Sequence, residues 1–170
     1  MCSLQARLQR AFFLPLSFLL LPLCSLAQEV VPQDPTAFGS EVTITPFAAG
    51  SFTGDSSAMG GGVGLDYFFT DKVGVGANYA VFAFDDEVHT VTADLALRYP
   101  ISKAGLSPYL LLGGGLSTDG TDTNGLYRLG GGMEVRLLNS QMGIFADGVH
   151  NWVANDEDFT IARLGVRLPY

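Results

Sequence analysis

Charged residues are scarce in this sequence of 170 residues. They make up 15% of it, against roughly 25% in an average soluble domain. Lysine is rarest of all, with Lys72 and Lys103 alone. The formal net charge is -8, and no cluster of Lys and Arg offsets it, so the chain would repel phosphate backbones. These shortages exclude nucleic acid as a partner and point to a non-aqueous neighbour.

Both cysteines of the sequence, Cys2 and Cys24, lie in its first segment. That segment has the layout of a secretory signal peptide, with two arginines, an apolar run over residues 11–26, and Ala27 before Gln28. A membrane-spanning helix needs about 20 apolar residues, and this run is shorter and contains two prolines. We predict that residues 1–27 are a signal peptide, cleaved after Ala27; the alternative is an uncleaved anchor.

A lipid anchor on Cys24 is a further alternative, but the residue before it is Leu23 rather than a small one. After cleavage, the remaining chain would contain no thiol. It would then have no disulfide, no thiolate metal site and no cysteine nucleophile.

Helical periodicity is also missing, since no stretch has an apolar period of 3.6 residues. Residues 28–40 contain two prolines and no periodicity, so we expect a short periplasmic tether there. From Glu41 onward apolar residues recur at every second position between clusters of Gly, Asp, Asn and Ser. We predict one all-β domain over residues 41–170, an eight-stranded antiparallel up-and-down transmembrane β-barrel. Its strands are expected at about 41–52, 58–69, 73–84, 88–101, 106–117, 125–138, 141–153 and 159–170, each long enough for the ~9–11 residues of a tilted bilayer crossing.

Two kinds of joint alternate between these segments. Three are short, at 70–72, 102–105 and 139–141, and carry both lysines, whereas the other four carry nine acids. Short turns of outer-membrane barrels face the periplasm and longer loops face outside. We therefore expect the acids on the outer rim, and both termini in the periplasm. The nine acids are Asp55, Asp85, Asp86, Glu87, Asp119, Asp122, Asp156, Glu157 and Asp158.

Each predicted strand has an apolar face and a polar face. The polar face is rich in Gly and mixes five arginines with four acids but no lysine, which predicts an internally paired network. Alternation alone also fits a soluble lipocalin-like barrel with an apolar cavity. Lysine-rich surfaces are expected in water, whereas an arginine facing the bilayer midplane costs about 2–4 kcal/mol, so we place the polar face in the lumen. The predicted lumen network is Asp66, Asp94, Arg98, Arg128, Glu134, Arg136, Asp147, Arg163 and Arg167.

Aromatic residues stand near the ends of the apolar faces, as in the interfacial girdles of membrane barrels. The residues on the predicted periplasmic side are Tyr67, Phe69, Tyr99 and Tyr170, and those on the other side are Tyr127 and Trp152.

The C-terminus carries the most specific pattern, Arg163, Gly165, Leu168 and Tyr170. With this spacing the sequence resembles the small outer-membrane β-barrel family of the OmpA/OmpX-like eight-stranded type, over essentially the whole chain after the signal peptide. The resemblance implies an outer-membrane location and recognition of this C-terminal signal by the barrel-assembly machinery. Two departures stand out, a terminal Tyr where Phe is commoner, and Pro46, which predicts a bulge or short pairing in the first strand.

Candidate catalytic and binding residues are few. The histidines, His89 and His150, stand near the acidic rim without a nearby Ser, so we expect no hydrolase site. Residues 119–125 miss the EF-hand spacing by one position, which favours diffuse attraction of divalent cations over a defined metal site. The glycine runs at 60–62, 113–115 and 130–132 lie inside strands and predict curved wall rather than phosphate loops.

Together these features predict a non-enzymatic integral outer-membrane protein with a structural, envelope-stabilising or surface-interaction role. Its expected partners are outer-membrane lipid, lipopolysaccharide, the barrel-assembly machinery and divalent cations at the acidic loops, with no cofactor and a monomeric state. A plugged lumen argues against continuous conduction. The alternatives are the soluble lipocalin-like barrel binding a small apolar ligand, and an outer-membrane lipid-modifying enzyme that would depend on His89 or His150.

Overall fold

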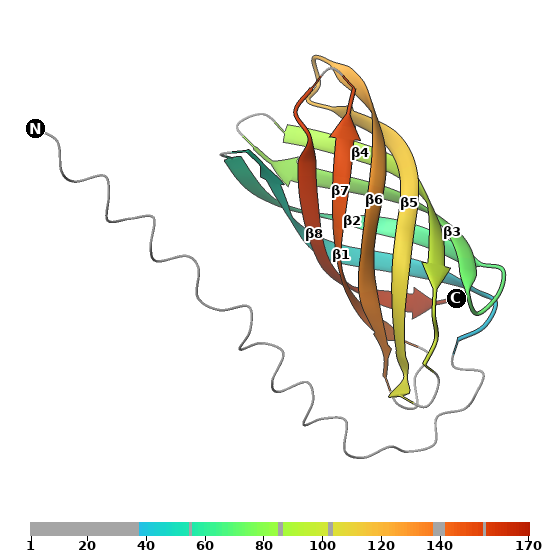
Figure 1. Ribbon diagram of the computed structural model, residues 1–170. Helices are drawn as coiled ribbons and strands as arrows, with labels where there is room; N and C mark the ends of the chain where they lie inside the picture. Colours follow the sequence, from blue (N-terminus) through green and yellow to red (C-terminus); the bar gives the residue numbers. More distant parts are fainter. Residues whose placement is uncertain (1–37, 55, 85–86, 102–103, 138–141, 155) are drawn as a thin grey trace, which may run out of the picture. The chain divides into compact units, whose positions relative to one another are not determined.

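The chain forms a closed β-barrel, as a computed structural model shows (Figure 1). The structure describes residues 38–54, 56–84, 87–101, 104–137, 142–154 and 156–170. Each strand pairs antiparallel with the next along the chain, and the last pairs with the first. The strands are β1 (Glu41–Thr53), β2 (Ser56–Phe68), β3 (Val73–Ala83), β4 (Glu87–Arg98), β5 (Leu106–Thr118), β6 (Thr123–Arg136), β7 (Gly143–Val153) and β8 (Phe159–Pro169).

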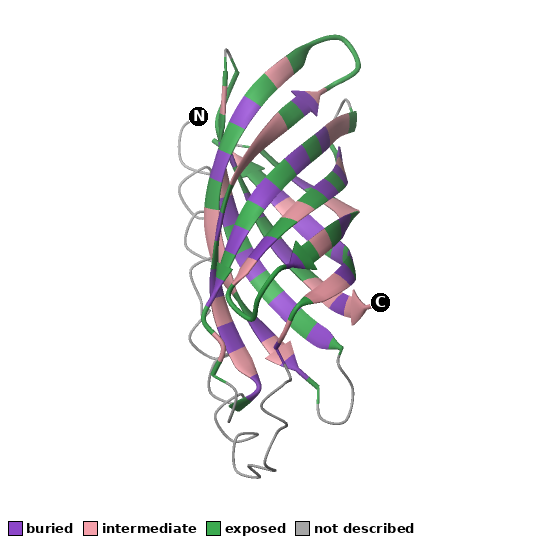
Figure 2. Cartoon of the chain, turned by 90° about the vertical axis from the view of Figure 1, so that its right-hand side faces the viewer, coloured by how far each residue is buried: buried purple, intermediate pink, exposed green. Residues whose placement is uncertain are grey.

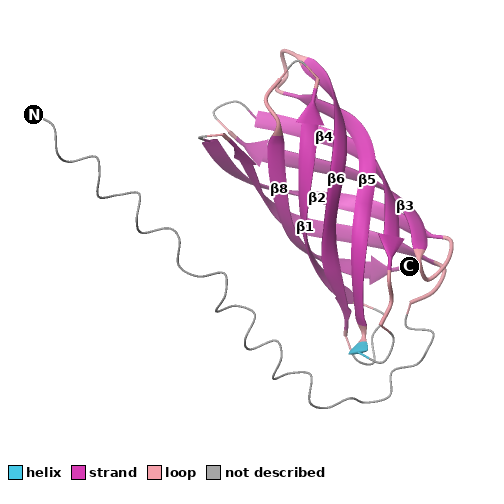
Figure 3. Ribbon diagram, in the orientation of Figure 1, coloured by secondary structure: helices cyan, strands magenta, loops and turns pink. Residues whose placement is uncertain are grey.

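Strands make up almost the whole of the barrel unit (Figure 3). The eight-stranded, all-antiparallel fold predicted from period-two alternation is confirmed, and the strand limits agree with the prediction to within three residues. The predicted signal peptide, residues 1–27, lies outside the described residues. Within the described part of the chain, no helix is long and apolar enough to cross a membrane.

Alternation decides which side chains face the lumen. Buried and exposed residues alternate along every strand (Figure 2). In β4, for example, Thr92 and Asp94 are buried, whereas Val91 and Leu95 are exposed. Because successive side chains of a strand point to opposite faces, the polar residues of this strand point inward and its apolar residues point outward.

The barrel has two distinct ends. Strand β1 starts and strand β8 finishes at one of them, which we call the terminal end, together with joints 69–72, 99–105 and 137–142. The opposite end, the acidic end, holds joints 54–55, 84–86, 119–122 and 154–158. The acidic joints were expected to be the longer set, and that expectation is wrong, because the strands extend further at this end. They leave joints of two to five residues there, against four to seven at the terminal end.

Pro46 marks a local weakness in the closing seam between β1 and β8. Either a bulge or a short pairing is expected there. These two fully described strands contain no bulge, since Ile44↔Leu168 and Phe47↔Gly165 share one register. The ladder is instead interrupted over the two positions between these pairs, Thr45 and Pro46. A proline has no N–H to donate, so the seam loses hydrogen bonds without a shift in register.

Inward-facing glycines let the wall curve around large polar side chains. A Cβ built on Gly113 would collide with the Asp94 carboxylate and the Ala93 carbonyl oxygen. A Cβ on Gly143 would lie 2.7 Å from the carboxylate of Glu134. These positions accept no side chain because the charged residues of the lumen already occupy the space.

Candidate functional site

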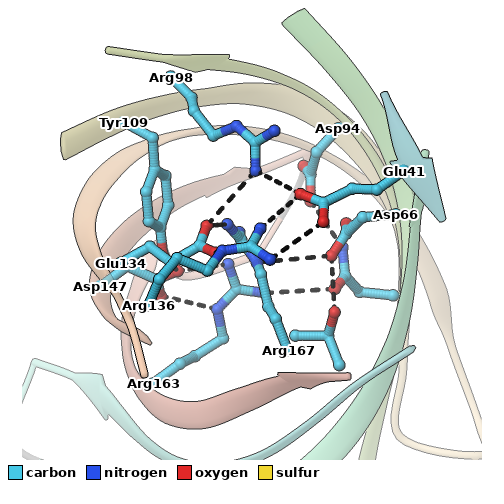
Figure 4. Close-up of polar contacts among 12 residues, drawn as sticks. Glu41, Asp66, Asp94, Arg98, Tyr109, Glu134, Arg136, Asp147, Arg163 and Arg167 are labelled. Atoms are coloured by element: carbon cyan, nitrogen blue, oxygen red, sulfur yellow. Dashed lines mark hydrogen bonds and ion pairs between the residues drawn. The ribbon is translucent and has the colours of Figure 1, made fainter. Parts of the chain in front are cut away.

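All nine predicted network residues lie on the inner face of the barrel, with contacts that cross the lumen. Figure 4 labels all of them except Arg128. They come from five strands, β2, β4, β6, β7 and β8. The structure groups them into two connected clusters. One lies toward the terminal end and contains Arg98, Glu134, Arg136 and Arg167, and the other lies deeper in the barrel and contains Asp94, Arg128, Asp147 and Arg163. The ninth residue, Asp66, lies 3.9 Å from Arg167.

The terminal cluster is organised around two carboxylates. Glu134 accepts a short hydrogen bond from Nη1 of Arg167, and its Oε1 lies 2.5 Å from Nε of Arg136. Arg98 lies 3.7 Å from the same carboxylate. Arg98 also donates from Nη1 to Oε1 of Glu41 at 2.8 Å, and Arg136 donates from Nη1 to Oε2 of Glu41 at 3.0 Å. Three guanidinium groups thus share two acids.

Glu41 is the functional residue that sequence reasoning missed. It is the first residue of β1, where no alternation precedes it to assign its face. Five arginines against four acids left one positive charge unpaired, and this imbalance was a signal that a fifth acid had to point inward. With Glu41 included, the lumen balances five arginines with five carboxylates. Such balance matters because an unpaired buried charge is strongly destabilising.

The deeper cluster is centred on Asp147. Arg163 donates to both its carboxylate oxygens, from Nε at 2.8 Å and from Nη2 at 2.9 Å, a bidentate geometry. The hydroxyl of Tyr109 donates to Oδ2 of the same carboxylate at 2.7 Å. Elsewhere in this cluster, Nε of Arg128 lies 3.2 Å from Asp94. Nη1 of Arg128 donates to Thr92 at 2.6 Å, and Nδ2 of Asn78 donates to Asp94 at 2.8 Å.

Phe38 packs against the charge network at the terminal end. It belongs to the segment predicted as a plain tether, residues 28–40, of which 38–40 are described, yet its side chain is only 4% exposed. The guanidinium groups of Arg98 and Arg136 lie 5.2 and 5.0 Å from its ring centre, and Arg98 also lies 3.6 Å from the ring centre of Phe68. Cations over aromatic faces are attracted electrostatically. The tether over residues 28–40 stays a prediction, and Phe38 near its end packs against the arginines inside the barrel.

These contacts determine what the site does chemically. Bonds from β1 to β4 and β6, and from β8 to β6, run across the lumen rather than along its wall. The side chains fill the barrel interior with paired charges, as expected for an eight-stranded barrel. Among the described residues no group of three or more His, Cys, Asp or Glu side chains could hold a metal ion. The network therefore connects strands on opposite sides of the barrel and braces its wall from inside.

The outer face of the barrel is apolar on all eight strands. Its members at the surface include Ile44, Met59, Val63, Leu65, Val75, Val91, Leu95, Leu97, Leu110, Leu112, Leu116, Leu129, Met133, Ile144 and Leu164. A soluble barrel would bury such residues in its cavity, and here the cavity side is charged. The lipocalin-like alternative is therefore wrong, because the two faces are the reverse of what it requires.

The aromatic residues predicted as girdles also lie on the outer face. Tyr67, Phe69 and Tyr99 are exposed toward the terminal end. Tyr127 and Trp152 are exposed toward the acidic end, where they are direct ladder partners. The two sets stand at opposite ends of an apolar band, the arrangement that amphipathic rings adopt at the two interfaces of a bilayer.

Both histidines contact side chains other than serine. Nδ1 of His89 lies 2.9 Å from the hydroxyl of Tyr79, and Nδ1 of His150 lies 2.9 Å from Oγ1 of Thr160. His150 also packs edge-on against Trp152. Within the described residues, no hydrogen bond or ion pair connects His150 to a carboxylate that would orient it as a base.

The acidic end gathers the described acids of the predicted rim, while Asp55, Asp85 and Asp86 lie outside the described residues. Oδ1 of Asp119 accepts hydrogen bonds from the backbone N–H groups of Asp122 at 2.8 Å and Thr121 at 2.9 Å. These donors favour the charged carboxylate and hold the pKa of Asp119 below its ordinary value. The bonds form a compact turn, in which Gly120 adopts φ 89°.

The four residues of the predicted assembly signal lie along β8 and just beyond it. Arg163 faces the lumen, Gly165 packs against Phe47 at the seam, and Tyr170 is 99% exposed. The backbone N–H of Tyr170 donates to the carbonyl oxygen of Val42, so the last residue still pairs with β1. Their recognition by assembly factors stays a prediction.

Comparison with known proteins gives likeness in structure alone, since no family model and no curated protein matches the sequence. Neisserial surface protein A aligns with a TM-score of 0.58 and 13% identity, over 76% of this chain and 96% of that chain. The N-terminal β-barrel domain of Pseudomonas aeruginosa OprF aligns with a TM-score of 0.58 and 17% identity, over 78% and 99%. Ail, the attachment invasion locus protein of Yersinia pestis, gives 0.56 and 18%, over 78% and 99%. The chain therefore has the fold of the small eight-stranded outer-membrane β-barrels.

Proposed function

We propose that this protein is an integral outer-membrane protein with a structural, envelope-stabilising or surface-interaction role, and that it neither conducts nor catalyses. One observation carries the proposal. The charged side chains of the barrel are paired inside it, while an apolar band with aromatic ends covers its outside. Five arginines facing lipid instead would cost about 2–4 kcal/mol each at the bilayer midplane, so lipid is the environment in which this distribution is stable.

The acidic end is proposed to face the cell exterior. Loop length argues against this orientation, because the acidic joints are the shorter set and short turns of outer-membrane barrels usually face the periplasm. Support comes from the start of β1 and the end of β8, which both lie at the opposite end, where a chain delivered from the periplasm would leave them. Acids at the outer surface would attract divalent cations, which bridge the phosphates of lipopolysaccharide. The C-terminal pattern ending at Tyr170 is proposed to be read by the barrel-assembly machinery, with the folded protein as a monomer.

The membrane assignment is tested by refolding the protein in detergent micelles and, separately, in plain buffer, followed by cold and boiled SDS gel electrophoresis. A heat-dependent change of mobility only after refolding with detergent is the expected result. A folded monomer in buffer alone would contradict the proposal. Recovery of the protein in the outer-membrane fraction of cells that express it, with protease access at the acidic joints only, tests location and orientation together.

The non-conducting and non-enzymatic parts require separate measurements. Planar bilayers that contain the folded protein are expected to show no steady current, and a stable open channel would contradict a lumen closed by its charge network. For catalysis, lipids from membranes that contain the wild-type barrel are compared with those that contain His150→Ala and His89→Ala. We expect identical lipid profiles; a modification that disappears with either variant would establish a lipid-modifying enzyme instead.

A further inference from the structure

A cavity of about 260 Å³ opens at the acidic end of the barrel. Its lining comes from six of the eight strands and from the joints that follow β3 and β7. Three aromatic rings, of Phe82, Phe84 and Phe159, share this lining with the hydroxyl of Ser51 and with two acids, Asp156 and Glu157. The cavity is separate from the charged network described above, whose residues do not line it.

The floor of this cavity is apolar. Phe82 and Phe159 are buried, and the next inward residue of β8, Ile161, belongs to the same apolar cluster as Val149. Beyond this layer, the guanidinium group of Arg163 is occupied by Asp147. The apolar layer therefore isolates the cavity from the arginines, so no positive charge lines it among the described residues.

Ser51 supplies a polar group that lacks a partner. Its side chain faces the lumen and is 1% exposed, and its Oγ has no hydrogen-bond partner among the described residues. Of the other inward hydroxyls, those of Thr45 and Thr92 have partners, since Thr45 donates to Asp66 and Thr92 accepts from Arg128. The hydroxyls of Thr43 and Ser107 also lack a partner among the described residues, but they do not line the cavity. A buried hydroxyl without a partner is costly in a folded protein, and a ligand in the cavity would relieve that cost.

Charge at the mouth of the cavity has one sign. The described residues of the joints at this end, 54, 84, 119–122, 154 and 156–158, include no Lys or Arg but five acids, Asp119, Asp122, Asp156, Glu157 and Asp158. Of the two lining acids, Asp156 accepts hydrogen bonds from the backbone N–H of Glu157 and, at 3.4 Å, from Asn124. The carboxylate of Glu157 has no such partner among the described residues. A cleft lined by one sign of charge concentrates ions of the opposite sign.

We propose that this cavity binds a small organic cation, with its ammonium group beside Glu157 and Asp156 and its apolar part against the phenylalanine rings. Aromatic faces recognise quaternary and alkylated ammonium ions, and the carboxylates supply the opposite charge. A hard metal ion fits poorly, because Ca²⁺ takes six to eight oxygen ligands and Mg²⁺ demands near-ideal octahedral geometry. Here the site combines two carboxylates with phenylalanine rings, which provide no oxygen ligand for such an ion.

The test uses the folded barrel in non-ionic detergent, with tetramethylammonium as the probe, tert-butanol as a neutral probe of similar shape, and MgCl₂, all at equal ionic strength. Binding is followed by the backbone amide shifts of Ser51, Glu157 and Phe159. Saturable shifts with tetramethylammonium, absent with tert-butanol and with Mg²⁺, are expected. Equal responses to the charged and neutral probes, a response to Mg²⁺ in place of tetramethylammonium, or no saturable response would each overturn the proposal.

Two variants and a matched control locate the site. Glu157→Gln is expected to weaken tetramethylammonium binding about fivefold, the value of an exposed ion pair. Phe84→Leu, which keeps an apolar side chain but removes the ring, is expected to weaken it by a similar factor. Glu87→Gln removes the same charge at the same end from a residue that does not line the cavity, and should change binding less than about twofold, because an exposed charge outside the site is largely screened by salt. Equal weakening by Glu87→Gln and Glu157→Gln would show diffuse attraction and overturn the proposal.

The barrel is first checked for heat-modifiable mobility in each sample. Failure to fold in detergent counts against the proposed membrane function, whereas failure of a folded barrel to bind the probe counts against the cavity alone.

Discussion

Replacement of Glu41 by Gln gives the sharpest test of the charge network. Glu41 holds two guanidinium groups, of Arg98 and Arg136, both almost fully buried, while its own side chain is 13% exposed. The introduced amide keeps the size of the side chain and removes its negative charge, so five arginines would face four acids. Removal of one partner from a buried ion pair costs about 3–5 kcal/mol. Because Glu41 retains some solvent contact, we expect a loss at the lower limit of this range, about 3 kcal/mol.

The free energy of unfolding is measured by urea titration of the barrel in phospholipid vesicles, with tryptophan fluorescence as the signal. The chain contains one tryptophan, Trp152, on the outer face, so the signal reports directly on the lipid environment of the wall. The matched control is Glu87→Gln, whose side chain is 75% exposed and lies 3.9 Å from His89. Its effect should stay within about 0.5 kcal/mol, as for most surface substitutions.

A double-mutant cycle separates pairing from packing. If Glu41 acts by neutralising Arg136, the Glu41→Gln/Arg136→Gln double variant should lose less stability than the two single losses added together, by roughly 0.5–3 kcal/mol. Strict additivity, or a Glu41→Gln loss no larger than that of Glu87→Gln, would refute the view that this acid completes the network.

Four further predictions follow from the wall, the packing and the loops. Leu112→Arg, at the middle of an outward face, should lower stability in vesicles by about 2–4 kcal/mol, whereas in a soluble barrel it would be neutral; equal stability of variant and wild type would contradict a lipid-facing wall. Gly113→Ala should prevent heat-modifiable folding, because its Cβ would overlap a carbonyl and a carboxylate, while Gly148→Ala, with nothing within 4 Å, should fold normally. Phe38→Ala should lower the free energy of unfolding by about 3 kcal/mol in the same urea titration, because it removes a buried ring; an unchanged free energy of unfolding would contradict the packing of Phe38 against the barrel. The depressed pKa of Asp119 means that its contribution is present above its ordinary pKa of 3.8 and is lost as pH falls through the lower folded value, so its NMR titration midpoint should lie below 3.8.

The sequence predicts the barrel well because each strand repeats the alternation of apolar and polar residues many times. A strand such as β4 alternates over twelve residues, so its face assignment does not depend on any single position. The same repetition places Asp94 and Arg98 inside. Glu41 begins β1 and Phe38 precedes it, so no alternation before them assigns their faces, and the sequence does not place them in the network although both contact its arginines.

The loop lengths and the cavity at the acidic end cannot be predicted from the sequence, for a different reason. Strand ends depend on how far the ladder continues, which is a property of two strands rather than one, and Ser56 and Glu87 extend their strands into stretches rich in turn-forming residues. The cavity depends on which inward side chains happen to meet above Phe82 after closure. Period-two alternation predicts whether each of these side chains points inward or outward, but not how far apart side chains of different strands lie across the lumen.

Closure of the barrel explains why the network involves β1 and β8 so heavily. The register sets Thr45 opposite Arg167 and Pro46 opposite Val166, and neither pair continues the ladder. At this point Asp66 of the neighbouring strand β2 connects the two sides, since it accepts a hydrogen bond from Thr45 at 2.7 Å and lies 3.9 Å from Arg167. Arg167 is in turn fixed by Glu134 from across the lumen. Side chains inside the barrel thus join the first and last strands where the ladder is interrupted at Pro46, so the charge network also helps to close the wall.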